Sequence, residues 1–261
     1  MNHWYLGTIG FSYKDWVGSF YPSGTSQRGY LFFYCKVFNS VELDTTFYSI
    51  PHHSTVQSWL NISPPEFQFC IKTPRRITHE LGLRGAQGLM IEFIDSIHDL
   101  GEKLGPILIQ LPPKYSQENY STVDEFLKSL PHTHQYAIEF RHSSWYNGRT
   151  THLLSKHQVC WVSSDFLNLP KEIIPIANFL YIRWIGVNGT HQHHTHERVD
   201  KTDELRFWLK RISPFFDQVP DVYGFFNNDY AGCAAGTCKR FKQIAGLGKE
   251  ADNLPFQGRL F

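Results

Sequence analysis

The sequence predicts an α/β fold, namely a (β/α)8 barrel of the TIM type with parallel strands and outer helices. Eight short apolar runs rich in β-branched and aromatic residues recur along the 261 residues, and segments with helical spacing lie between them. Strands that alternate with helices are typical of repeated βαβ units and a parallel sheet. Eight such units in a chain of about 250 residues are typical of this barrel.

The expected strands are short segments bounded by polar or turn-forming residues. They comprise residues 5–12, 40–47, 67–73, 106–112, 135–141, 158–165, 178–185 and 221–228. The clearest helices comprise residues 89–104, 121–130 and 202–212. The first ends before Gly105 and Pro106, which stop a helix, and the second opens with Ser121 and Asp124 in a loose capping box. Residues 167–177 contain two prolines, so we expect little more than a turn there.

We expect a single domain over residues 1–261. The sequence shows no internal repeat, low-complexity tract or change of composition that would indicate a linker. An open doubly wound sheet is the alternative to the barrel. That fold is disfavoured because "GTIGFSY" after the first strand lacks the third glycine of a dinucleotide-binding fingerprint and leads into no helix.

Composition excludes several classes of protein. The formal net charge is +1, so no overall field favours nucleic acid or a membrane. The start of the chain has no secretory leader pattern, and no apolar run approaches the roughly 20 residues that span a bilayer. We therefore expect a cytoplasmic protein without membrane association. The odd number of scattered cysteines argues against a disulfide framework: Cys35, Cys70, Cys160, Cys233 and Cys238.

Polar side chains gather near the carboxyl end of most of the expected strands. They are Glu42, Asp44, Thr46, Lys72, Gln110, Glu139, Arg141, Asp165, Arg183, Asn227 and Asn228. In a barrel these strand ends converge on one face, where active sites are built. The sequence therefore predicts one charged pocket at that face.

A structural interpretation of the charged residues stays open. Four acids face three bases, so internal salt bridges could satisfy the whole set: Glu42, Asp44, Glu139 and Asp165 against Lys72, Arg141 and Arg183. A buried ion network, however, contributes little stability compared with an apolar layer of similar volume. We favour the interpretation as a functional site.

The candidate catalytic residues are Glu42, Lys72, Glu139 and Asp165. Two glutamates on strands two and five lie across the barrel mouth, and paired carboxylates with basic neighbours suit general acid–base chemistry. Sugar hydrolysis, isomerisation or an aldol-type lyase reaction would each fit, and whether the protein is an enzyme stays uncertain. Lys72 could form a Schiff base, although a role as a counter-ion is the simpler one.

The candidate ligand-binding residues indicate a small phosphorylated or carboxylated, sugar-like ligand. Arginines and amides provide the polar contacts, and aromatic rings provide stacking on a sugar or an unpaired base. The set comprises Trp16, Tyr48, Gln110, Arg141, His142, Trp145, Arg183, Asn227 and Asn228. Small residues from Gly232 to Gly236 before a helical segment suit a phosphate, or equally a tight helix contact.

We expect no metal, and the sequence identifies no cofactor. Glu42, Glu139, Asp165 and His142 include suitable ligand atoms, but few histidines lie at strand ends. The histidine-rich run "HQHHTHE" at residues 191–197 lacks the helical spacing of a ligand pair, so we interpret it as a solvated loop.

Six motifs in order along the chain carry a family resemblance: "GTIGFSYKDWVGSFYP", "VELDTTFYSIP", "FQFCIKTPRRITHE", "LGPILIQLPPKY", "EFRHSSW" and "FFNNDYAGCA". They span nearly the whole chain and resemble the YecE-like family, the domain of unknown function numbered 72. The resemblance implies a (β/α)8-like barrel, similar to those of the endonuclease IV and xylose isomerase group, and no established reaction. The chain departs from the family pattern at three positions. The family usually has Asn at the positions of Asp44 and Thr237 and His at the position of Ile185. A mechanism through a histidine at 185 is therefore in doubt.

An alternative function is nucleic-acid binding or processing. Gln257, Leu260 and Phe261 resemble a peptide that binds a DNA sliding clamp, although a tail folded back on the barrel explains them equally well. Basic residues in loops after strands would form the contact surface: Lys14, Arg75, Arg76, Lys114 and Arg149. A third alternative is a non-catalytic interaction barrel.

Overall fold

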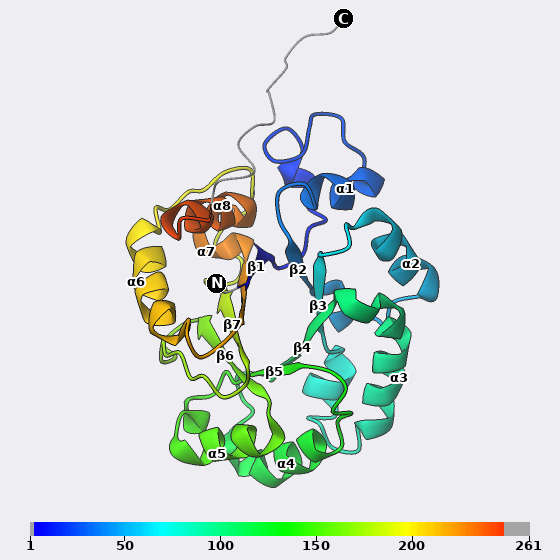
Figure 1. The fold of residues 1–261 in the computed structure, drawn as a ribbon, viewed down its shortest axis with the longest axis vertical. Helices are drawn as coiled ribbons and strands as arrows, with labels where there is room; N and C mark the ends of the chain where they lie inside the picture. The colour runs from blue at the N-terminus through cyan, green and yellow to red at the C-terminus, as the bar shows by residue number, and fades with distance from the viewer. Residues whose placement is uncertain (1–2, 248–261) are drawn as a thin grey trace, which may run out of the picture.

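Eight parallel strands surround a common axis in the computed structural model, which describes residues 3–247, and helices pack around their outside (Figure 1). The strands are β1 His3–Thr8, β2 Ser40–Leu43, β3 Gln68–Lys72, β4 Leu104–Gln110, β5 Tyr136–Glu139, β6 Cys160–Asp165, β7 Phe179–Trp184 and β8 Asp221–Phe226. They form one sheet in the order β1-β8-β7-β6-β5-β4-β3-β2. The predicted (β/α)8 barrel is confirmed.

The helices follow the strands in alternation. They are α1 Tyr30–Tyr34, α2 His53–Ile62, α3 Gln87–Ile97, α4 Tyr120–Lys128, α5 Gly148–His157, α6 Thr202–Ile212, α7 Asn228–Ala231 and α8 Ala234–Ile244. Short 3-10 helices comprise Lys14–Trp16, Gln27–Gly29, Thr45–Phe47, His98–Lys103, Gln117–Asn119, Ser143–Trp145 and Ser213–Phe215. Residues 166–178 contain no helix, as the two prolines predict.

The barrel closes between β1 and β2 through side chains. Between these two described strands there is no ladder of backbone hydrogen bonds, and one isolated β-bridge pairs Ile9 with Glu42. Below it, the Tyr34 hydroxyl accepts the Thr8 N–H at 2.8 Å and donates to the Ser40 carbonyl at 3.0 Å. The Asn39 amide accepts the Leu6 N–H at 3.0 Å and donates to the Trp4 carbonyl at 2.7 Å. These side chains satisfy backbone groups that a ladder would otherwise pair.

A glycine allows the two strands to approach at this seam. A Cβ atom on Gly7 would lie 1.9 Å from the Ser40 carbonyl oxygen, which no side chain could tolerate. Above it, the Gly10 N–H donates to the Glu42 carbonyl at 2.7 Å and completes the closure. The seam therefore depends on residues of the first two βα units.

The core has two layers separated by the strands. The outer layer lies between strands and helices and is rich in aromatic rings, such as Trp184 stacked on Phe226 at 4.2 Å. The inner layer fills the barrel with Ile9, Cys70, Leu108, Ala137, Cys160, Val162, Phe179, Tyr181, Ile185, Tyr223 and Phe225. Since successive residues of a strand face opposite sides, this layer shows which strand-end residues face inward.

Three predicted elements differ from the structure. The expected helix 89–104 ends at Ile97, whose φ of −109° and ψ of 0° are not helical, and two short 3-10 turns separated by a kink at Gly101 follow it. The first two strands end early, at Thr8 and Leu43. Thr46 consequently leaves the inward face and donates to the Lys72 carbonyl at 2.7 Å.

All five cysteines are free, as expected. Within residues 3–247, no helix has the length and apolarity to cross a bilayer.

Changing Tyr34 to Phe tests the closing seam. We expect the free energy of unfolding to fall by about 1–3 kcal/mol, because the Thr8 N–H and the Ser40 carbonyl lose a buried partner. Urea unfolding followed by circular dichroism measures the change. Tyr30→Phe is the matched control: this tyrosine is also buried, and its hydroxyl has no hydrogen bond to any residue from 3 to 247. Equal losses in the two variants would contradict the role of Tyr34.

Candidate active site at the carboxyl ends of the strands

Arg183 on β7 lies at the centre of a buried ion network inside the barrel. Its side chain is only 3% exposed and binds two glutamates from other strands. The guanidinium is bidentate to Glu42 on β2, with Nε at 2.9 Å from Oε2 and Nη2 at 2.7 Å from Oε1. Its Nη1 donates to Oε2 of Glu139 on β5. One cation therefore joins three strands across the interior.

Two further donors complete the network. The Tyr181 hydroxyl donates to Glu42 Oε2 at 2.8 Å, and Arg141 Nε donates to Glu139 Oε1 at 3.0 Å. All four carboxylate oxygens thus accept a hydrogen bond. Burial alone would raise the pKa of Glu139, but Arg141 and Arg183 outweigh it and lower this pKa to about 2. Glu139 is therefore ionised at neutral pH and is poorly suited to carrying a proton.

Lys72 on β3 lies beside this network without an ion pair of its own. Its Nζ lies 4.1 Å from the centre of the Phe47 ring, and within residues 3–247 no carboxylate approaches it to 4.0 Å. Burial and the positive charges of Arg183 and Arg141 lower the Lys72 pKa to about 8, although Glu42 and Glu139 act in the opposite direction. A fraction of this amine is therefore neutral near physiological pH.

Asp44 and His79 extend the site around Lys72. Burial, reinforced by the charge of Glu42, raises the pKa of Asp44, while Lys72 partly offsets the rise. His79 lies in a π-helical turn, Arg76–Glu80, and its ring packs edge-on against Phe47 at 4.9 Å. Burial and the charges of Lys72 and Arg141 lower the His79 pKa to about 4, so its imidazole is neutral at pH 7.

The structure brings together six of the seven predicted charges, with Asp165 as the exception. Asp44 acts on Glu42 and Lys72 through its charge. Glu42, Lys72, Glu139, Arg141 and Arg183 interact as described, and Gln110 joins them because it pairs in register with Glu139. Gln110 is 3% exposed, and its amide donates to the Leu111 carbonyl at 2.7 Å. The set forms a closed network rather than the open pocket that the sequence suggested, since its two glutamates and Arg183 are fully buried.

Asp165 does not join the cluster, which corrects the prediction. On β6 the inward positions are Cys160, Val162 and Ser164, so residue 165 faces the outer helices. Its carboxylate accepts from Trp208 Nε1 at 2.9 Å and from the Tyr230 hydroxyl at 3.1 Å, and it pairs with Lys171 at 2.6 Å.

Two of the predicted stacking aromatics lie in the outer core. Trp16 packs against Tyr13 and Phe20, and Trp145 stacks on Phe140 at 4.3 Å, with both indoles fully buried. Their short 3-10 helices fold the loops inward, which corrects the expectation that these rings line the rim.

Two other predicted ligand residues differ in their exposure. Tyr48 is 80% exposed at the rim and is available to a ligand. His142 caps the 3-10 helix Ser143–Trp145, since its Nδ1 accepts the Ser144 N–H at 3.2 Å.

The expected anion site before α8 is filled by the protein. Asn227 accepts the Asp229 N–H at 2.9 Å and caps α7, and Asn228 accepts the Ala234 N–H at 2.9 Å at the start of α8. Glu197 packs against Gly236 and pairs with Arg240 at 2.7 Å. The small residues therefore serve helix contacts, the alternative that the sequence left open.

The histidine-rich loop is tethered across the rim. The His194 N–H donates to Asp15 at 3.1 Å, and the Gly189 N–H donates to Asp229 at 3.1 Å. The His194 ring lies 6.4 Å from Tyr13. No group of three potential metal ligands occurs within residues 3–247.

The predicted clamp-binding residues Gln257, Leu260 and Phe261 lie outside the described residues.

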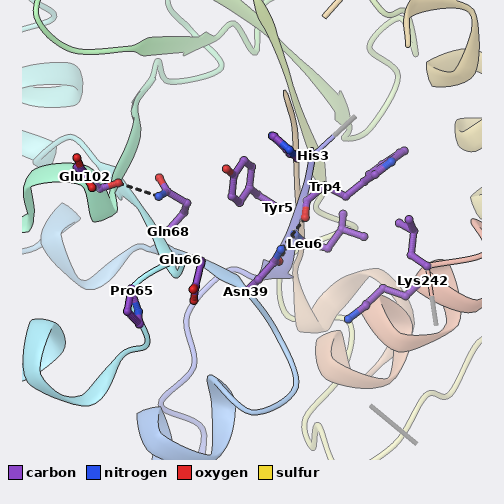
Figure 2. Close-up of a pocket in the computed structure, with 11 residues that line it drawn as sticks. His3, Trp4, Tyr5, Leu6, Asn39, Pro65, Glu66, Gln68, Glu102 and Lys242 are labelled. Carbon is purple, nitrogen blue, oxygen red and sulfur yellow. Dashed lines mark hydrogen bonds between the residues drawn. The ribbon is translucent and has the colours of Figure 1, made fainter. Parts of the chain in front are cut away.

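A cavity of about 710 Å³ opens at the opposite, amino end of the strands (Figure 2). Trp4, Tyr5 and Gln68 line it, and the Gln68 amide donates to the Glu102 carbonyl at 2.8 Å. That end of a barrel generally serves stability, whereas chemistry is built at the carboxyl end. We therefore place the candidate site at the ion network.

Sequence reasoning missed two contributors and gave a third no specific role. Tyr181 shares strand parity with Arg183, so its inward position could have been inferred. His79 could not, because a π-helical turn has no distinct sequence pattern. Asp44 was placed in the charged pocket but was not named as a catalytic or ligand-binding residue.

A family model described as "Protein of unknown function DUF72" matches residues 5–258. The UPF0759 protein YecE of Escherichia coli K12 is 31% identical over 142 residues, which cover 54% of this chain and 50% of YecE. The match therefore spans half the length of that relative. The UPF0759 protein YunF of Bacillus subtilis strain 168 is 25% identical over 92% of this chain and 94% of YunF.

Solved structures of the same kind share the fold. A DUF72 family protein from Thermotoga maritima MSB8 superposes with a TM-score of 0.81 at 30% identity, over 93% of this chain and 99% of that chain. A DUF72 family protein from Enterococcus faecalis V583 has a TM-score of 0.74 at 21% identity, over 94% and 96%.

Changing Arg183 to Met tests the network. We expect the free energy of unfolding to fall by roughly 3–5 kcal/mol at pH 7, because two buried carboxylates lose their shared cation. Chemical denaturation measures the loss. Arg206→Met is the control, since Arg206 is 65% exposed in its pair with Asp203 and should change stability by less than about 0.5 kcal/mol. A small loss for Arg183→Met would show that the glutamates find other compensation.

Proposed function

This chain belongs to the DUF72 family of proteins of unknown function, and we propose that it is an enzyme. Its reaction would be acid–base chemistry at the barrel mouth on a small, sugar-like ligand that carries a phosphate or carboxylate group. One observation carries the proposal. Lys72, with a pKa of about 8, lies among ionised groups and forms no ion pair with a described residue.

The paired glutamates leave proton transfer to other groups. Arg141 and Arg183 keep Glu139 ionised, and both carboxylate oxygens of Glu42 already accept hydrogen bonds from Arg183 and Tyr181. Lys72 has the appropriate pKa, since roughly a fifth of an amine with a pKa near 8 is neutral at pH 7.4. Groups that titrate close to the working pH are the most effective general acids and bases.

Asp44 supplies a second titrating group. Burial raises the pKa of Asp44, so its protonated form, which can donate a proton, persists to higher pH than in an exposed aspartate. Asp44 and Lys72 act on each other through their charges without a direct ion pair between described residues. In the proposed reaction, neutral Lys72 removes a proton from the ligand and Asp44 delivers one to a ligand oxygen, as an isomerase or a lyase requires.

Arg141 supports binding of the anionic group. Its side chain is 16% exposed, and only Nε is bonded, to Glu139. Both terminal nitrogens are without a hydrogen-bond partner among residues 3–247, so they can bind a phosphate or carboxylate in bidentate fashion.

Labelling of Lys72 tests the proposal. Pyridoxal 5′-phosphate, a phosphorylated aldehyde, is incubated with the protein and fixed with borohydride, and the modified lysine is identified by mass spectrometry. We expect Lys72 to react with a half-maximal rate near pH 8 and to be protected by ribose 5-phosphate. Arg141→Met should weaken the protection.

Exposed Lys114 is the internal control for this experiment. Its labelling should be insensitive to ribose 5-phosphate. If ribose 5-phosphate protected Lys72 no better than Lys114, the proposed function would lose its main support.

Nucleic-acid binding is a second candidate, favoured by the exposure of all five basic rim residues: Lys14, Arg75, Arg76, Lys114 and Arg149. They lie in the segments that follow β1, β3, β4 and β5, on the same side of the barrel, and Arg149 lies in the first turn of α5. Such a surface would bind the phosphate backbone without a deep pocket.

Titration of labelled DNA against salt distinguishes the two candidates. A nucleic-acid surface predicts affinity that falls steeply with salt and weakens further in Arg149→Glu. Absence of binding to single- and double-stranded DNA at low salt would eliminate this candidate, whereas labelling of Lys72 would be unaffected.

A further inference from the structure

A cavity of about 490 Å³ lies beside the candidate active site, between the loops that follow β2 and β3 and the start of α3. This volume is in the range of small-molecule pockets. Its walls include Phe47, Tyr48 and Ile50 from the first loop and Arg76, Ile77 and Glu80 from the second. The cavity is therefore built by two consecutive βα units at the carboxyl end of the barrel.

The cavity shares a wall with the active site. The Phe47 ring lines the cavity and also lies 4.1 Å from Lys72 Nζ and 4.9 Å from the His79 ring. In the π-helical turn Arg76–Glu80, the Leu81 N–H donates to the Arg76 carbonyl at 2.9 Å, five residues back. This turn contributes His79 to one side and Arg76 and Glu80 to the other. Turns of this type are frequent at functional sites.

The walls combine a flat ring, an apolar floor and polar groups of both signs. Tyr48 is 80% exposed and meets Phe47 edge-on at 5.3 Å, so a face of its ring is open. Ile50 and Ile77 provide the apolar surface. Arg76 is exposed and has no ion pair within residues 3–247.

Hydrogen-bond donors and acceptors stand beside that ring. Arg76 donates, and Glu80 accepts although it also lies 3.6 Å from Arg75. A planar heteroaromatic ring with its own donors and acceptors would satisfy these groups and stack on Tyr48.

We propose that this cavity is the ring-binding half of the substrate site and that the substrate class is a nucleoside monophosphate. The inference rests on the proposed function, because the sugar would lie at Lys72 and the phosphate at Arg141. The ring would then pass over Phe47 and stack on Tyr48. A sugar phosphate without a ring would leave the apolar floor and Arg76 without a partner.

Calorimetric titration with two probes tests the proposal. Ribose 5-phosphate contains the sugar and phosphate, and adenosine 5′-monophosphate adds the ring. We expect the nucleotide to bind roughly five- to hundredfold more tightly, the effect of one base stacked on an aromatic side chain. Equal affinities would overturn the ring site and leave the proposed function intact.

Two variants locate the ring. Tyr48→Ala should bring the ratio of the two affinities close to one, and Arg76→Ala should lower it in part. Phe207→Ala on α6 is the matched control, since that ring is 44% exposed and distant in the chain from the cavity, and the ratio should be unchanged. A ratio that persists in Tyr48→Ala would overturn the assignment. Failure of both probes to bind, in contrast, would overturn the proposed ligand class together with the ring site.

Discussion

The pairing of one buried arginine with two buried glutamates is the constraint on which the site depends. Arg183 lies inside a barrel where natural sequences usually place apolar side chains, so its charge is tolerable only with complete pairing. Glu42 and Glu139 provide it, and Tyr181 and Arg141 occupy the remaining carboxylate oxygens. Because these residues come from β2, β5 and β7, the pairing fixes how three strands are rotated relative to one another.

The network also separates structural charges from titratable ones. Glu139 and Arg183 keep their charges, since each ion stabilises the other. The pKa of Lys72 is lowered because its amine is desolvated and the two arginines repel its positive charge. The two carboxylates compensate only part of this effect. A fixed network of ion pairs can in this way shift the pKa of an adjacent side chain toward neutral pH. The buried charges can therefore stabilise the structure and also serve a functional site.

Sequence periodicity predicted the barrel and the inward position of Glu42, Lys72, Glu139 and Arg183, because strand alternation is a local property. It failed where a strand ends, as at Asp165, since one residue of register decides between the two faces. It also failed in loops. Trp16 and Trp145 lie in short 3-10 turns without a periodic pattern, and only tertiary packing decides that their rings are buried. Asn227 and Asn228 were assigned to a ligand because cap residues and binding residues are chemically alike.

The seam between β1 and β2 has a consequence for the order of assembly. The ladder partner of β1 is β8, whose first residue, Asp221, pairs with His3. A chain emerging from the ribosome therefore carries its first strand through most of synthesis with Tyr34 and Asn39 as its nearby tethers. Final closure has to wait for β8, so the first and the last described strands complete the barrel together.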